Sequence, residues 1–158
     1  MDTQSRLIVV DTNIFVIDLR YPRDRHFAVN RRFLQKLAQT GNGATTIFNV
    51  LEVCGILSFN LNGQQLQELF HHLSQKYHGQ ILPFAVLDRP LPFLTGSDLF
   101  GYLEQKASFG DALLMATIAT HLPHATQFVS WDAPHFRGKI RFPVLTPNEF
   151  LRSPSEPV

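Results

Sequence analysis

The sequence predicts an α/β protein, a three-layer α/β/α sandwich built around a mainly parallel sheet. Short apolar segments rich in branched residues alternate with longer segments of helical periodicity, which is typical of strands connected through helices. The first apolar segment, residues 7–10, contains no polar residue, as in a central parallel strand that is buried on both faces. A chain of 158 residues, 44% hydrophobic and 17% charged, has the size and composition of one folded domain.

The first elements follow from local patterns. The strand of residues 7–10 ends at Asp11, and apolar residues at helical spacing then predict an amphipathic helix over residues 26–39. Residues 44–47 form the second predicted strand.

Two helices are predicted next, each with an asparagine as its N-cap. Asn49 is expected to cap a helix that reaches about residue 60, and Asn62 caps a second helix. The apolar stripe of the second helix consists of Leu66, Leu69, Phe70, Leu73 and Tyr77.

The chain continues with a third predicted strand, residues 81–87, and a proline-containing loop. Ser97 is expected to end this loop by capping a short helix. Ser108 caps a helix over residues 109–122, which is apolar nearly all round and should therefore be buried.

The last two predicted strands are residues 127–130 and 143–145. A turn or small helix at residues 133–137 separates them. We find no repeat, no low-complexity segment and no second domain in the sequence.

Composition excludes several classes of protein. Cys54 is the only cysteine, so neither an intrachain disulfide nor a cysteine-rich zinc site can form. No apolar run has the length of a membrane span, and the segment before Asp11 is unlike the core of a signal peptide. The expected location is therefore the cytoplasm, and no association with a membrane is expected.

Four acids occupy equivalent positions on the predicted fold. Asp11 ends the first strand and Asp132 follows the strand that ends at Ser130, while Glu52 and Asp111 lie in the first turns of their helices. In open parallel sheets, ligands bind beyond the carboxyl ends of the strands, and helix N-termini point there as well. We therefore expect the four carboxylates to converge.

Each acid also has a structural explanation. Asn49-x-x-Glu52 and Ser108-x-x-Asp111 match capping boxes, and Asp132 could serve as an N-cap. Asp11 differs, because a carboxylate at the end of a buried strand needs hydrogen-bond donors or a cation to offset its desolvation.

Converging carboxylates repel one another, and a divalent cation resolves that conflict. Ligands that are all oxygen select hard ions such as Mg²⁺ or Mn²⁺. Such an ion can activate a water molecule and stabilise charge on a phosphoryl group, which is the chemistry of a nuclease.

With these acids the chain resembles the PIN-domain ribonucleases, and most closely the VapC-type toxins of prokaryotic toxin–antitoxin pairs. The resemblance covers nearly the whole chain and rests on five segments in the family's order. They are residues 8–15 with the Asp11-Thr12-Asn13 turn, residues 49–53, residues 109–119 with Asp111-Ala112, residues 128–132 with Phe136, and residues 143–151.

The resemblance implies a PIN-like nuclease domain over residues 1–151 and a short C-terminal tail over residues 152–158. It also implies endonucleolytic cleavage of RNA, Mg²⁺ or Mn²⁺ bound by the four acids, a homodimer and a neutralising antitoxin. Two features depart from the family: residues 88–96 have no counterpart, and Trp131 stands where a smaller or polar residue is commoner.

Polar residues beside the acids are expected to support them. Thr12, Asn13 and Ser130 could orient carboxylates or hold waters bound to the metal. Ordinary turn capping is the alternative for Asn13 and Ser130.

A net charge of +1 gives no global electrostatic attraction for nucleic acid, so any RNA contact must be local. We predict that Arg23, Arg25, Arg31 and Arg32 hold the RNA backbone. The alternatives are a solvated helix face and a helix whose apolar stripe of Phe27, Leu34 and Leu37 serves dimerisation or antitoxin binding.

Rival enzyme classes lack their motifs. A haloacid-dehalogenase-like phosphatase needs a second aspartate where Asn13 stands, and neither a P-loop nor a Gly-x-Ser-x-Gly elbow is present. The serious alternative is a PIN-like RNA- or protein-binding module without catalysis, in which the acids serve only as caps.

Overall fold

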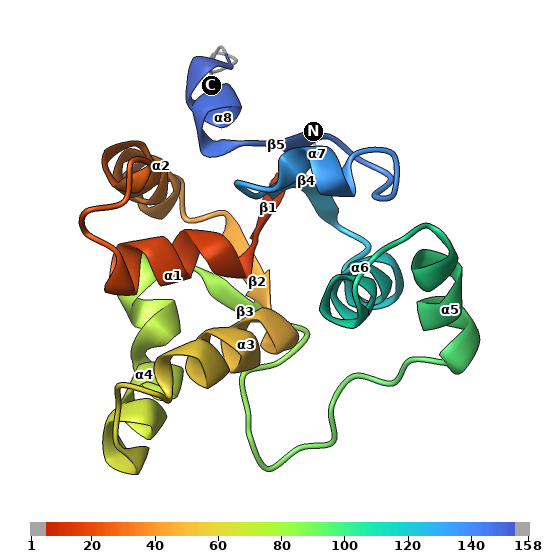
Figure 1. Cartoon of the computed structure of the whole chain (residues 1–158), viewed down its shortest axis with the longest axis horizontal. Coiled ribbons are helices and arrows are strands. Elements are labelled where there is room, and N and C mark those ends of the chain that lie inside the picture. The colour runs from red at the N-terminus through yellow and green to blue at the C-terminus, as the bar shows by residue number, and fades with distance from the viewer. Residues whose placement is uncertain (1–5, 154–158) are drawn as a thin grey trace, which may run out of the picture.

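The computed structural model describes residues 6–153, and its centre is a five-stranded sheet in the order β3-β2-β1-β4-β5 (Figure 1). Every neighbouring pair of strands is parallel. The strands are β1 (Leu7–Val10), β2 (Gly43–Thr46), β3 (Gln80–Leu82), β4 (Ala125–Val129) and β5 (Val144–Leu145).

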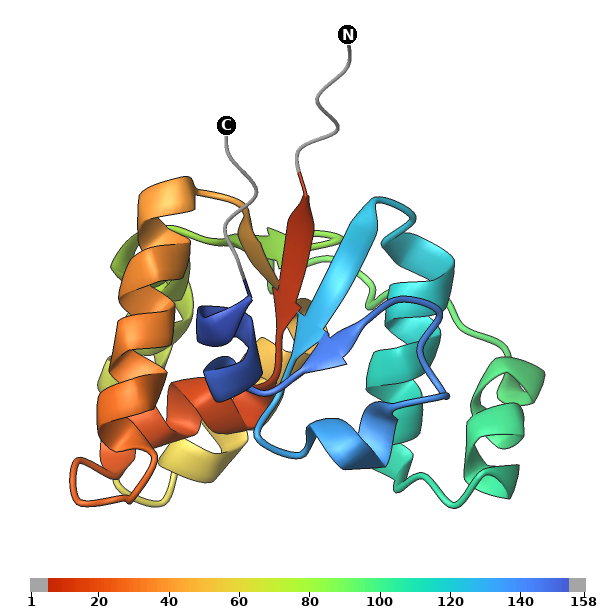
Figure 2. The same ribbon diagram turned by 90° about the horizontal axis from the view of Figure 1, so that it is seen from above.

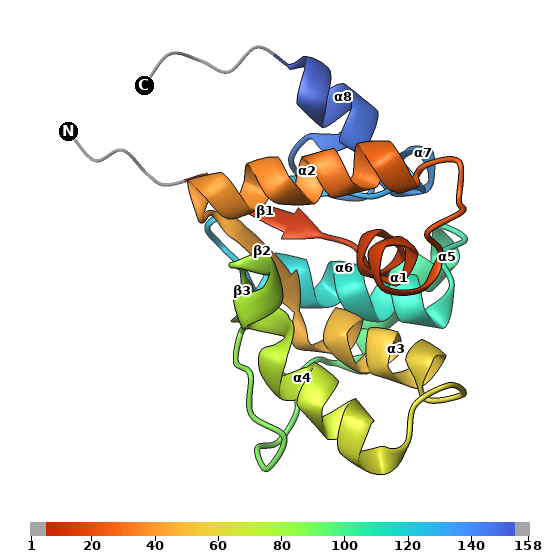
Figure 3. The ribbon, with the colours of Figure 1, turned by 90° about the vertical axis from the view of Figure 1, so that its left-hand side faces the viewer.

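Helices cover both faces of this sheet, so the predicted three-layer α/β/α arrangement is confirmed (Figures 2 and 3). The helices are α1 (Thr12–Arg20), α2 (Phe27–Thr40), α3 (Ile47–Leu57), α4 (Gly63–Tyr77), α5 (Gly96–Glu104), α6 (Phe109–His121), α7 (Ala133–Phe136) and α8 (Pro147–Arg152). On one face α2 packs against α1 and α8; on the other lies α6, with α5 packed against it.

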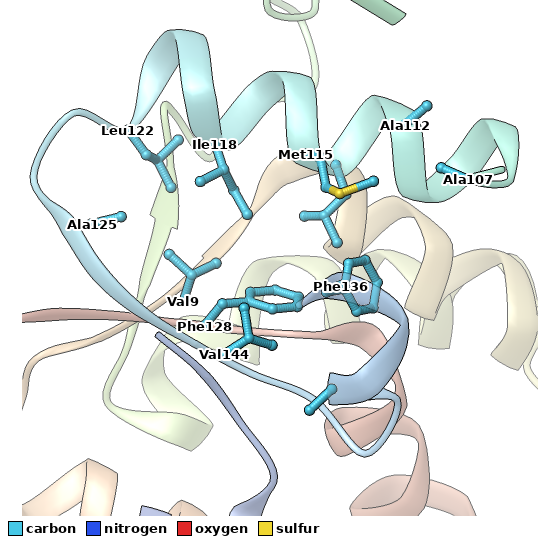
Figure 4. Packing of buried hydrophobic residues seen from close by; sticks show 12 residues of the cluster. Val9, Ala107, Ala112, Met115, Ile118, Leu122, Ala125, Phe128, Phe136 and Val144 are labelled. Atoms are coloured by element: carbon cyan, nitrogen blue, oxygen red, sulfur yellow. The ribbon is translucent and has the colours of Figure 1, made fainter. Parts of the chain in front are cut away.

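Alternate side chains of β1 divide the core into two layers. Val9 packs with Met115 and Ile118 of α6, as Figure 4 shows, and its side chain is fully buried. Ile8 and Val10 point the other way and join the cluster formed by α1 and α2. Since both faces of β1 are covered, an unbroken apolar strand is the sequence that this position requires.

The connection order places a switch point between β1 and β4. The chain builds β1, β2 and β3 outward in one direction and then adds β4 and β5 on the opposite side of β1. Crevices at the carboxyl ends of parallel strands form at such a point. Asp11 follows β1 there, and Ser130 follows β4.

Several predicted boundaries were wrong for identifiable reasons. The third strand ends at Leu82 rather than residue 87, because Pro83 lacks the N–H that the ladder would need. Helix α3 begins at Ile47 with Thr46 as its N-cap, so Asn49 is the third helical residue and not the cap. Likewise Thr95, and not Ser97, caps α5.

Two helices were missing from the prediction. Helix α1 starts directly after Asp11, and its adjacent buried residues Ile14, Phe15 and Val16 give no clear helical stripe. Helix α8 ends at Arg152, the first residue of the predicted tail, and residues 154–158 lie outside the described part of the chain.

Within residues 6–153, no helix combines the length and the apolarity that crossing a membrane requires.

Candidate active site

Asp11 lies at the base of the crevice and is held by three donors. Its Oδ1 accepts hydrogen bonds from the backbone N–H of Thr12 (2.8 Å) and from Nδ2 of Asn49 (3.3 Å). Its Oδ2 accepts a hydrogen bond from Oγ of Ser130 at 2.6 Å. Asp11 is only 7% exposed, so these donors replace the water that burial removes.

Thr12 and Asn49 connect Asp11 to Glu52. The hydroxyl of Thr12 donates to Oε2 of Glu52 at 2.7 Å, and Nδ2 of Asn49 donates to Oγ1 of Thr12 at 2.9 Å. Asn49 is fixed in turn by the capping box at the start of α3, in which Thr46 and Asn49 bond to each other's backbone N–H. The first turn of α3 therefore sets the position of the Glu52 side chain beside Asp11.

On the opposite side of Asp11, Asn13 joins α1 to the turn after β4. Its Nδ2 donates to Oγ of Ser130 (3.1 Å) and to Oδ2 of Asp132 (3.4 Å). Ser130 Oγ also accepts the backbone N–H of Asp132 at 3.0 Å. The predicted supporting residues Thr12, Asn13 and Ser130 thus all contact an acidic side chain.

Asp111 reaches the same crevice from the first turn of α6. Its backbone N–H donates to Oγ of Ser108 at 3.1 Å, which caps the helix. Its carboxylate meets α7, where Nε2 of His135 lies 3.0 Å from Oδ2 of Asp111. His135 is a site residue that the sequence analysis missed, although Asp132-x-x-His135 places both residues at the start of one short helix.

The four predicted acids line one pocket of about 620 Å³. Its wall also contains an apolar and aromatic part. The lining residues are Asp11, Thr12, Asn13, Val16, Glu52, Ile56, Asp111, Trp131, Asp132, Pro134, His135 and Phe136. Residues from four separate segments of the chain meet here, which is the convergence expected at the carboxyl edge of the sheet.

Burial and neighbouring charge act on Asp11 together. Desolvation is the main cause that raises the pKa of Asp11 from 3.8 to about 7, and the negative charges of Glu52 and Asp111 add to it. The hydrogen bonds from Ser130 and Thr12 lower the pKa and so oppose this effect. A strongly shifted carboxyl in a cleft of acids is characteristic of functional sites.

The four acids fit a hard divalent cation, because each offers carboxylate oxygens as metal ligands. Within residues 6–153, however, no three acidic, histidine or cysteine side chains form a group that could hold one ion. Mg²⁺ usually keeps several waters and binds few carboxylates directly. The residues therefore fit a hydrated ion held through one or two carboxylates rather than an ion enclosed by all four.

The structural explanations of the acids are only partly correct. Glu52 lies in the second turn of α3 and forms no capping box, since Thr46 and Asn49 do so. Asp132 precedes α7, but its side chain makes no capping hydrogen bond. Asp11, for which no capping role was expected, is the N-cap of α1. Helix capping therefore does not account for the carboxylates of Glu52 and Asp132.

The predicted RNA-binding arginines lie outside this pocket. None of Arg23, Arg25, Arg31 and Arg32 is among its described lining residues. Arg31 instead pairs with Asp18, with Nε 3.2 Å from Oδ1, and Asp18 is nearly buried. Arg25 is linked to the pocket indirectly. Its Nε donates to Nε2 of His26, and His26 stacks on Trp131, which lines the pocket.

The alternative role of helix α2, a docking surface for dimerisation or an antitoxin, was based on an apolar stripe that is not available on the protein surface. Leu34 and Leu37 are both buried in the core next to β1. Phe27 is half-buried and lies under the guanidinium of Arg31, 5.0 Å from ring centroid to Cζ. The stripe packs within the protein and leaves mainly the polar face of α2 in contact with solvent.

Known proteins resemble this chain in fold. No protein-family model and no curated protein sequence matches it. A chain in the crystal structure of FitAcB from Neisseria gonorrhoeae matches with a TM-score of 0.57 and 21% identity, covering 89% of this chain and 98% of that one. A chain in the structure of FitAB bound to an IR36 DNA fragment matches with the same TM-score, identity and coverage of this chain, and is covered to 95%. The chain therefore has the PIN-like α/β/α fold that its sequence predicts.

Proposed function

We propose that the protein is a metal-dependent endoribonuclease that hydrolyses RNA phosphodiester bonds. The observation that supports this most strongly is the single pocket lined by Asp11, Glu52, Asp111 and Asp132 at the switch point of the sheet. Four carboxylates gathered in one pocket, with Asp11 buried and its pKa raised, repel one another unless a cation binds.

The acids would hold Mg²⁺ or Mn²⁺, which supplies positive charge for the phosphoryl oxygens and lowers the pKa of water when bound. The chain's own residues orient the acids. Ser130 and Asn49 hold the carboxylate of Asp11, Thr12 holds Glu52, and Asn13 holds Asp132. Such supporting contacts typically change metal affinity or activity by about 10- to 100-fold when they are removed.

The test is cleavage of RNA by the purified protein with Mg²⁺ or Mn²⁺, and with excess EDTA. We expect chelation to abolish cleavage. Asp11→Asn should keep the fold, because the amide is the same size, and should lose activity, because it lacks the negative charge. Asp88→Asn, which changes an exposed acid in the loop before α5, is the matched control and should cleave normally. Cleavage that persists in EDTA, or in Asp11→Asn at the wild-type rate, would refute the proposal.

The second candidate is a PIN-like binding module without catalysis. Two observations favour it: the carboxylate of Asp11 already accepts three hydrogen bonds, and within residues 6–153 no three ligands are grouped for a metal. Calorimetric titration with Mn²⁺ separates the two functions, because a pure binding module would show no saturable site that Asp11→Asn weakens.

The proposal extends to partners. The resemblance to VapC-type toxins implies a homodimer and a neutralising antitoxin, and the matching structures are of FitAcB and of FitAB bound to DNA. We expect growth arrest on expression of the chain, relieved by the Asp11→Asn change or by co-expression of the antitoxin. Light scattering of the purified protein measures whether the chain is a dimer.

A further inference from the structure

The pocket contains a surface that phosphodiester hydrolysis does not require. Beside the four acids, its wall includes Val16 of α1, Ile56 of α3, Trp131 and Pro134 of α7. A phosphate and a hydrated cation need polar partners, whereas an unstacked nucleobase needs a flat apolar or aromatic surface. The mixed lining therefore fits a whole nucleotide better than a phosphate alone.

Trp131 is fixed in place from three directions. Its indole N–H donates to Oδ1 of Asn30 at 2.9 Å, and Asn30 is fully buried and itself donates to the carbonyl of Ile14 at 2.8 Å. The backbone N–H of Trp131 donates to Oδ1 of Asn13 at 3.3 Å. The imidazole of His26 stacks on the indole, with ring centroids 3.9 Å apart and an interplanar angle of 22°.

This pair joins the acidic pocket to a basic segment. Trp131 lies between Ser130, which donates to Asp11, and Asp132. On the other side, His26 accepts a hydrogen bond from Nε of the exposed Arg25 at 3.2 Å. Aromatic rings on which bases stack, next to an arginine that can meet the backbone, are the general means by which proteins hold single-stranded nucleic acid.

We propose that the stacked His26–Trp131 pair, with the apolar wall of the pocket, is a nucleobase-binding site that holds the nucleotide next to the scissile phosphate. The inference deepens the proposed function and rests on it, since the bound nucleotide belongs to the RNA substrate. Arg25 contacts the phosphate backbone at the outer edge of this site, and the buried Asn30 keeps the indole ready for stacking.

Trp131 is the only tryptophan in the chain, so intrinsic fluorescence reports on this one position. The experiment titrates Asp11→Asn protein, which should not cleave, with tetraadenylate and with an abasic ribose-phosphate tetramer of the same charge. We expect saturable quenching by tetraadenylate and about tenfold weaker binding of the abasic chain, in line with the energy of one base–aromatic stack.

Variants of His26 test the pair itself. His26→Ala should weaken the binding of tetraadenylate about fivefold and leave the binding of the abasic chain unchanged. His26→Phe, which retains a ring, should restore the difference in affinity between the two ligands. His72→Ala, which changes an exposed histidine of α4, is the matched control and should bind both ligands as before. Circular dichroism confirms that each variant is folded.

The outcomes separate this inference from the proposed function. Equal affinity for tetraadenylate and the abasic chain would overturn the inference and make the pair a structural clamp for the loop before α2, even if RNA is cleaved. Quenching that depends on the base would support it even if wild-type protein with Mg²⁺ leaves RNA intact, a result that would refute only the nuclease.

Discussion

Asp11 combines two opposing physical effects in one side chain. Burial and the nearby Glu52 and Asp111 favour its neutral form, while the donors Ser130 and Thr12 favour the carboxylate. With a pKa of about 7, the side chain is close to balance near neutral pH without a cation. A cation in the pocket would shift this balance toward the carboxylate, as expected of a metal ligand.

The raised pKa of Asp11 predicts how stability depends on pH in the metal-free protein. Folded Asp11 keeps its proton up to about pH 7, whereas the unfolded chain ionises near 3.8. The folded state binds more protons between these values, so the free energy of unfolding falls as pH rises, by up to about 1.4 kcal/mol per pH unit. Urea unfolding in EDTA should show this fall between about pH 5 and about pH 7 in the wild type and a smaller one in Asp11→Asn. The same slope in both proteins would contradict it.

His135 contacts the side chain of Asp111, just as Thr12, Asn13 and Ser130 each contact the side chain of another acid. Its ring lies 3.0 Å from the Asp111 carboxylate, and both side chains are partly exposed at the pocket. We expect this contact to hold the Asp111 carboxylate in the direction of the other acids.

We predict that His135→Ala weakens Mn²⁺ binding and RNA cleavage by about 10- to 100-fold, as loss of an orienting contact usually does. His135→Asn, which retains a donor, should recover part of both. The matched control is His124→Ala, an exposed histidine in the loop before β4. Calorimetric titration with Mn²⁺ gives the affinity independently of cleavage, and an unchanged affinity in His135→Ala would argue against an orienting role.

At the scale of secondary-structure elements, local sequence patterns predicted which helices and strands exist better than they predicted where these begin and end. The strand at residues 7–10 could be predicted because an unbroken run of four apolar residues has few alternatives. Helix α6 could be predicted because its N-cap Ser108 is followed by a long apolar segment. The start of α3 was misplaced, because Thr46 and Asn49 are both good caps and only the buried end of β2 decides between them.

Two misses were of different kinds. The capping box of α8, Thr146 with Glu149, and Pro147 at its first position are visible in the sequence, but no helix was predicted there. The contacts of Trp131 with His26 and Asn30 could not be predicted, because they join residues about 100 positions apart. The convergence of the acids, in contrast, could be predicted, because the carboxyl ends of parallel strands and the N-termini of the following helices meet at one edge of the sheet.

The capping box of α3 links helix stability to the site, which predicts a difference between two similar substitutions. Thr46→Ala removes a buried cap and should lower the free energy of unfolding by about 1–2 kcal/mol. It should also slow RNA cleavage, because Asn49 loses the partner that aims it at Asp11 and Thr12. Thr95→Ala removes the equivalent cap of α5, away from the pocket, and should cost stability alone. Equal activity of the two variants would contradict the link.

At the scale of the whole molecule, charge is divided between a site and its surroundings. The net charge is only +1, and the pocket itself gathers four acids, so the pocket repels an RNA backbone until a cation binds. Under the proposed function, attraction for RNA would come from the basic segment between α1 and α2 and from the start of α2 itself. The structure distinguishes the four predicted arginines there, because Arg31 is already paired with the nearly buried Asp18 whereas Arg23 and Arg25 lie in the exposed loop.

This difference makes the salt dependence of RNA binding a test of the arginines. Each phosphate contact releases counterions, so each lost contact should lower the salt slope by about 0.7 for a single strand. Neutralising Arg23, Arg25 and Arg32 should therefore weaken RNA binding most at low salt and leave the cleavage of bound RNA little changed. Adding Arg31→Gln should change the slope less than the others do and should instead lower stability, because Asp18 would lose its cation in a nearly buried position. Arg89→Gln, in the exposed loop before α5, is the control for a general loss of charge. An unchanged slope in the triple variant would mean that these arginines do not hold phosphate, and RNA would then have to approach the acids from another side.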